Sequence, residues 1–182
     1  MRHTVRPGLF AALLAVTLAT AASGSAAFAA DPKPTAAPAR SLAITGGVER
    51  PLELSADRLR QRPAHQIVEL QLPGKDGGAP SVVRGVRLRD LLDEAKIVTR
   101  DHNTVKKLAV IAGASDGYKV VFSWSELFNS PAGDSVLVLF ERDGKPLPAA
   151  EGPLALVAGK DLRTGPRHVK WLQAVEVRQI VE

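Results

Sequence analysis

The stretch of sequence that decides the fold spans residues 151–172, EGPLALVAGKDLRTGPRHVKWL. Its apolar runs at 153–157 and 168–177 predict two strands on either side of a glycine-containing loop. Basic side chains collect on this loop and its edges, directly before a tryptophan, and such a group could cradle an anionic ligand that carries a ring. A solvated hairpin loop followed by an aromatic core residue is the alternative, and composition alone slightly favours it. The residues concerned are Lys160, Arg163, Arg167, His168, Lys170 and Trp171.

The expected strand at 168–177 limits which basic groups can act together. Successive side chains of a strand point to opposite faces, so His168 and Lys170 would share one face and Arg167 and Trp171 the other. Polar and aromatic groups also meet in the turn at Asp116 and Tyr118, which lies between two predicted strands. We therefore count this turn among the candidate ligand contacts.

The first 29 residues have the pattern of a secretory signal peptide. Arg2 and Arg6 give a positive start, residues 9–22 are apolar, and small residues precede the expected cleavage after Ala29. The apolar run is shorter than the roughly 20 residues of a spanning helix, and no later segment reaches that length. The pattern predicts export to the periplasm, with no membrane span once the signal peptide has been removed.

Residues 30–40 are rich in proline and alanine and lack an apolar period, which predicts a flexible linker. The remaining residues, 41–182, are long enough for one domain with its own hydrophobic core.

Charge and cysteine content exclude several classes of protein. Without Arg2 and Arg6, 22 Lys and Arg stand against 19 Asp and Glu, a net charge of +3, which is too weak a bias for a dedicated nucleic-acid binder. The chain has no cysteine, so it has no disulfides, thiolate nucleophile, iron–sulfur cluster or cysteine-type zinc site. Its histidines are far apart, and no metal-binding spacing occurs.

The order of predicted elements favours an α+β domain with a mixed sheet and short helices. Strand patterns dominate, short helices interrupt them, and no regular alternation of strand and helix occurs. Serine begins two of the helices as an N-cap, and Ser123 with Glu126 forms a capping-box pattern. The predicted strands are 41–45, 51–54, 66–72, 81–86, 104–112, 118–122, 135–140, 153–157 and 168–181, and the predicted helices begin at 56, 88 and 124.

Motifs for common chemistry are missing. The sequence contains no GxSxG elbow, P-loop or dinucleotide fingerprint. The glycine-rich loop at 74–78 could form an anion nest, but no helix begins close behind it.

A series of short motifs resembles the molybdopterin-binding domain of the sulfite oxidase superfamily. The motifs are GVRLRDLL at 85–92, DGY at 116–118, DGKPL at 143–147, GPL at 152–154 and VKWL at 169–172. Their order and spacing cover essentially the whole expected domain. The resemblance implies an α+β mixed-sheet fold and a pterin-type or molybdopterin-type ligand.

The departures from that family concern its metal. The family binds molybdenum through a cysteine in the loop that corresponds to residues 72–74, where this chain has Leu-Pro-Gly. The family's histidine before the GPL motif is Glu151 here, and its following arginine is Ala155. A smaller exported branch of the superfamily also lacks the cysteine, and its members look like pterin-binding proteins without molybdenum. Some of them are thought to work beside membrane signalling proteins.

The resemblance implies a ligand site between the segments 159–171, 72–78 and 116–118. Trp171 would stack on the pterin ring, and Arg163, Arg167 or His168 would hold its polar edge or a phosphate. Two alternatives remain open. One is a molybdopterin-dependent oxidoreductase with an atypical metal site, served by a redox partner. The other is an interaction module whose pocket has decayed.

Overall fold

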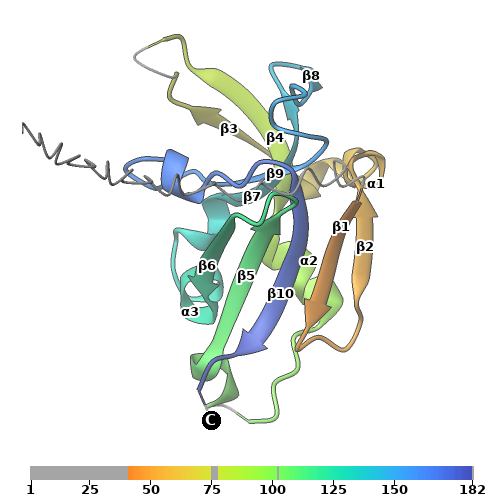
Figure 1. The fold of residues 1–182 in the computed structure, drawn as a ribbon, viewed down its shortest axis with the longest axis vertical. Coiled ribbons are helices and arrows are strands. Elements are labelled where there is room, and N and C mark those ends of the chain that lie inside the picture. The colour runs from red at the N-terminus through yellow and green to blue at the C-terminus, as the bar shows by residue number, and fades with distance from the viewer. Residues whose placement is uncertain (1–40, 75–77, 102, 182) are drawn as a thin grey trace, which may run out of the picture. The chain divides into compact units, whose positions relative to one another are not determined.

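The computed structural model describes residues 41–74, 78–101 and 103–181. The predicted signal peptide and linker lie outside these residues, as does the centre of the glycine-rich loop at 74–78. Two sheets and three short α-helices make up the described chain, so the predicted α+β mixed-sheet class is confirmed (Figure 1). Within it, no helix has the length and apolar character needed to cross a membrane.

The first sheet has five strands in the order β2-β1-β10-β5-β6. β1 and β10 run parallel, and the other neighbours run antiparallel, so the sheet is mixed. Its middle strand is formed by the C-terminal segment, which places the end of the stretch 151–172 inside this sheet. The strands are β1 Ser41–Gly46, β2 Leu52–Ser55, β5 Leu108–Ala114, β6 Lys119–Ser123 and β10 Leu172–Gln179.

The second sheet is antiparallel and pairs β3, β4, β7 and β8 in that order, with β9 also on β7. Its central strand β7 is apolar at five consecutive positions because side chains on both of its faces are buried. The strands are β3 Ile67–Leu72, β4 Ser81–Arg87, β7 Val136–Arg142, β8 Lys145–Pro146 and β9 Ala155–Ala158.

The helices are short and begin where the sequence predicts. The hydroxyl of Ser55 accepts a hydrogen bond from the amide of Arg58, and that of Ser123 accepts one from the amide of Glu126, as N-caps do. The helix that follows β4 buries one face, including Leu88. The α-helices are α1 Ala56–Arg60, α2 Leu88–Ala95 and α3 Trp124–Phe128, and the 3₁₀ turns are η1 Ala64–Gln66, η3 Thr104–Lys107, η4 Gly133–Ser135 and η5 Gly165–Arg167.

Two hydrophobic cores lie on opposite faces of the second sheet. Val136, Val138 and Phe140 of β7 belong to the larger core, which also contains one face of the first sheet and residues from all three α-helices. Leu137 and Leu139 belong to the smaller core on the other face. Successive side chains of β7 therefore point alternately into the two cores.

The structure corrects two of the predicted strands. Residues 104–107 form the turn η3, and only the rest of the predicted strand is extended, as β5. Residues 168–171 are not part of a strand, because Trp171 has a positive φ of 47° and β10 begins only at Leu172. The predicted alternation of faces from Arg167 to Trp171 is therefore wrong.

Candidate functional site

The segment 151–172 links the two sheets. β9 belongs to the second sheet and β10 to the first. Between them, the backbones of Leu156 and Val169 exchange two hydrogen bonds of 2.8 and 2.9 Å, and the amide of Leu172 donates to the carbonyl of Leu154 at 2.9 Å. These bonds fix both ends of the basic loop, so the loop is held at the junction of the sheets.

Arg167 braces this loop from inside. Its guanidinium donates to the carboxylates of Asp161 and Glu126 and lies 4.8 Å from the centre of the Phe122 ring. The hydrogen bond with Asp161 raises the pKa of Arg167, burial opposes this, and the bond with Glu126 adds to the rise. Two carboxylates thus compensate one guanidinium, and Arg167 is a structural cation.

A second polar cluster joins the start of β4 to the segment 151–172. Arg142 donates to the hydroxyl of Ser81 and, through Nη2, to Oε2 of Glu151 at 3.0 Å. Nε2 of His168 lies 3.4 Å from the same carboxylate oxygen. Burial would raise the pKa of Glu151, but the nearby imidazole of His168 and the hydrogen bond from Arg142 outweigh it and lower the pKa to about 2. The carboxylate therefore stays charged and holds both neighbours.

Trp171 packs on the backbone of Gly152. A Cβ atom at Gly152 would lie 2.5 Å from Cδ1 of the indole, so only glycine leaves room for the ring. The amide of Trp171 donates to the carbonyl of Glu151, and its carbonyl accepts from the amide of Ser115. These contacts hold the backbone of Trp171 in a left-handed conformation, and its indole is half-buried.

The turn with Asp116 and Tyr118 lies beside the same segment. The hydroxyl of Tyr118 donates to the carbonyl of Pro166, and a carboxylate oxygen of Asp116 accepts from the amide of Tyr118 at 3.0 Å. Since Ser115 also contacts Trp171, the structure brings this turn and the basic loop together as the sequence suggested. Leu70 of β3, which precedes the third predicted segment 72–78, packs close to Gly159, since a Cβ atom at Gly159 would lie 2.1 Å from its Cδ2 atom. Residues 75–77 of that segment lie outside the described residues.

The other predicted cations point outward. The ammonium of Lys160 donates to the carbonyl of Pro131 at 2.9 Å. Arg163 and Lys170 are exposed and form no ion pair with any residue that the structure describes. Next to Arg163 in sequence, the fully exposed Leu162 marks the outer side of the loop. Of the cations predicted on this segment, Arg163 and Lys170 thus have side chains that form no hydrogen bond or ion pair with a described residue.

Sequence reasoning missed the acidic partners. Asp161 lies within the basic loop, and its presence in the sequence is the signal that the charge of Arg167 could be neutralised locally. Glu126 fits a capping box in the sequence, but its carboxylate binds Arg167 in the structure. Arg142 is the last residue of β7, before the Asp143-Gly144 turn, and nothing in its local sequence predicts its contact with Glu151.

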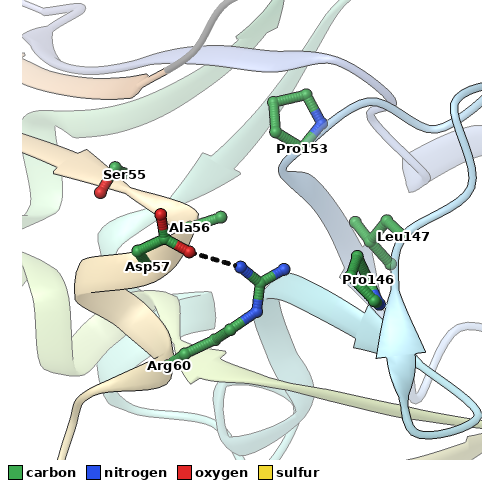
Figure 2. A pocket seen from close by; sticks show the side chains of 7 residues that line it. All are labelled: Ser55, Ala56, Asp57, Arg60, Pro146, Leu147 and Pro153. Carbon is green, nitrogen blue, oxygen red and sulfur yellow. Dashed lines mark hydrogen bonds and ion pairs between the residues drawn. The ribbon is translucent and has the colours of Figure 1, made fainter.

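A hollow of about 280 Å³ lies close to the GPL motif (Figure 2). Pro153 forms part of its wall, and Arg60 extends from α1 toward Pro146. The guanidinium of Arg60 already donates to Asp57 at 2.7 Å and to the carbonyl of Phe140 at 3.0 Å. The hydrogen-bonding groups of Arg60 are therefore largely occupied by the protein itself. The lining residues are Ser55, Ala56, Asp57, Arg60, Pro146, Leu147 and Pro153.

Comparison with known proteins supports the fold and the family. The family model for the oxidoreductase molybdopterin binding domain matches residues 30–181. Among solved structures, the crystal structure of the sulfane dehydrogenase SoxCD from Paracoccus pantotrophus is similar, with a TM-score of 0.57 and 22% sequence identity. The match covers 75% of this chain and 37% of that chain, so this chain spans little more than a third of its length. No curated protein matches the sequence significantly.

Proposed function

We propose that this chain, which belongs to the oxidoreductase molybdopterin-binding domain family, is an exported protein that binds a pterin-type ligand without catalysing a redox reaction. The proposal is supported by the family match and by two exposed cations, Arg163 and Lys170, that lie on the same braced segment as the half-buried Trp171. Cationic side chains can form charge-assisted hydrogen bonds with a phosphate, and an indole can stack on a flat ring.

The donor groups of the chain do not fit molybdenum held through a thiolate. The sequence contains no cysteine. In the described parts of the chain, no three His, Asp or Glu side chains lie together as a metal site would require. Soft sulfur ligands and hard carboxylate or imidazole ligands select different metals, so a replacement by other side chains would change the metal chemistry. The side chains present therefore support ligand binding rather than a reaction step at a thiolate-bound metal.

The proposed roles differ from residue to residue. Trp171 would provide the aromatic wall, and the phenol of Tyr118 borders the same segment through Pro166. Arg163 and Lys170 would pair with a phosphate. Arg167 and His168 would position the loop, since carboxylates already engage both side chains.

The signal-peptide pattern supports export, and a ligand-binding domain without its own catalytic metal suits a sensor. We therefore propose that the ligand-bound form is recognised by a membrane signalling partner. Co-purification from membranes with and without added pterin tests this second step separately from binding itself.

Isothermal calorimetry of the purified chain with reduced pterins and with molybdopterin tests the proposal. We expect saturable binding to at least one of them, weakened by about two- to five-fold in Arg163→Gln and in Lys170→Gln, because an exposed ion pair contributes about 0.2–1 kcal/mol. Lys145→Gln is the matched control, since Lys145 is also an exposed lysine but lies on β8. The absence of heat and of a thermal shift with every pterin would overturn the proposal. Stoichiometric molybdenum in protein purified from its native compartment would favour the enzyme instead.

A further inference from the structure

A hollow with an aromatic wall lies between α2, α3 and the chain that follows β1. Its volume is about 380 Å³. It contains no residue of the candidate pterin site, so the proposed function does not account for it. The lining residues are Glu49, Asp93, Lys96, Ile97, Thr99, Trp124 and Phe128.

The aromatic wall consists of Trp124 and Phe128, one turn apart on α3. Their ring centres are 5.1 Å apart and the ring planes differ by 17°, so the rings are stacked. Both side chains pack against the larger core while remaining partly exposed. Part of the aromatic edge of the core is therefore accessible here.

The opposite wall is held by backbone contacts. The amide of Glu49 donates to the carbonyl of Lys96 at 2.8 Å, and the amide of Val98 donates to the carbonyl of Gly47 at 2.9 Å. Val48 and Ile97 form an isolated antiparallel bridge between these bonds. The backbone that carries the charged groups of the hollow is therefore pre-formed.

Carboxylates outnumber cations among the residues that line this hollow. Glu49 and Asp93 are exposed carboxylates that form no ion pair with any residue in the described ranges, and Lys96 is the one cation among the lining residues. Burial raises the pKa of Asp93 and the neighbouring charge of Asp90 raises it further, while Arg89 opposes part of this rise. A cation entering the hollow would relieve this repulsion.

We propose that the hollow binds an alkylguanidinium group, as an arginine side chain carries, with the planar group on the Trp124–Phe128 wall and its N–H groups directed to Glu49 and Asp93. A guanidinium is planar, so its face can stack on aromatic rings while the N–H groups at its edge donate to carboxylates. An ammonium is more strongly hydrated and therefore fits such a site less well. The alkyl stem of the ligand would contact Ile97. Both a partner protein and free arginine could supply this chemistry.

The indole N–H resonances of the ¹⁵N-labelled chain provide the test. The chain has two tryptophans, so the spectrum of Trp124→Phe identifies the resonance of Trp124. At low ionic strength the chain is titrated with N-acetyl-arginine amide, with its neutral isostere N-acetyl-citrulline amide, and with free arginine. We expect a saturable shift of the Trp124 resonance with the first probe and a weaker effect with the citrulline probe.

Substitutions on the walls give the second readout. Asp93→Asn and Glu49→Gln should each weaken binding of N-acetyl-arginine amide by about two- to five-fold, and Lys96→Gln should strengthen it by a similar factor. Asp57→Asn, a carboxylate at the hollow of Figure 2, should leave binding unchanged. Tighter binding of the blocked probe than of free arginine assigns the ligand to a protein side chain, and the reverse assigns it to the amino acid. The proposal is overturned if no probe gives a saturable shift at Trp124, or if the citrulline probe binds as well as the arginine probe.

Discussion

Nη2 of Arg142 lies 3.0 Å from Oε2 of Glu151, and both side chains are largely buried. This pair ties the end of β7 to the segment 151–172, and through Ser81 it also reaches the first residue of β4. The glutamate thus anchors the candidate site.

Glu151→Gln should lower the free energy of unfolding by about 2–3 kcal/mol at neutral pH, because it leaves the buried guanidinium of Arg142 without a charged partner. The folded-state pKa of Glu151 is lowered from 4.5 to about 2. A carboxylate with a lowered pKa stabilises the fold above its unfolded pKa, and this contribution is lost as the pH falls from about 4.5 toward 2. We therefore expect the wild type to lose on the order of 2 kcal/mol more than Glu151→Gln over this range in urea titrations.

Glu69→Gln is the matched control for that experiment. Glu69 is an exposed carboxylate that lies 3.4 Å from Arg84, so its removal should change stability by less than about 0.5 kcal/mol. Parallel pH profiles for the wild type and Glu151→Gln would show that the buried pair does not hold the carboxylate in its charged form.

Gly152→Ala should destabilise the fold by about 2–4 kcal/mol, since the new methyl group overlaps the indole of Trp171 and the residue has a φ of +80°. Gly144→Ala separates the two causes. Gly144 has a similar φ of +72°, but no atom lies within 4 Å of the place that a methyl group would take, so only the backbone strain of about 1–2 kcal/mol remains. Thermal unfolding of both variants measures the difference, and equal losses would mean that the indole moves aside freely.

Local patterns were sufficient to predict most of the fold. The capping serines, the helix at 88–95 and the apolar run of β7 each depend on neighbours in sequence, so their spacing identified them. The strand predicted through Trp171 failed because the positive φ at that residue is imposed by contacts with Glu151 and Ser115, which lie far away in sequence.

The candidate site was harder to predict than the fold. Its basic loop and the Tyr118 turn do lie together, but charge compensation depends on partners from other elements. Glu126 is 41 residues from Arg167 along the chain, and no local pattern connects them. A count of basic residues in the loop therefore overestimates the cations that a ligand could use.

Arg167→Gln should lower the stability of the chain, whereas Arg163→Gln should weaken pterin binding and leave stability nearly unchanged. Loss of Arg167 leaves Asp161 and Glu126 as neighbouring carboxylates and removes the contact with Phe122, so we expect a loss of about 2–3 kcal/mol. Arg163 is exposed, and its replacement should stay within about 0.5 kcal/mol of the wild type. Denaturant titration measures both. If Arg167→Gln keeps full stability but loses pterin affinity, Arg167 is a ligand contact and its role as a brace is wrong.

Lys96→Gly should stabilise the chain by about 0.5–1 kcal/mol. Lys96 follows α2 with a φ of +55°, a left-handed conformation in which glycine avoids the steric cost that a side chain meets. Part of this gain is offset because glycine also increases the entropy of the unfolded chain.

Lys96→Ala separates charge from strain, since it removes the ammonium from the hollow but keeps a Cβ atom in the left-handed conformation. We expect both variants to bind N-acetyl-arginine amide more tightly than the wild type, and only Lys96→Gly to unfold at a higher temperature. A lower unfolding temperature for Lys96→Gly would mean that the packed lysine stem stabilises the wall by more than the strain at Lys96 destabilises it.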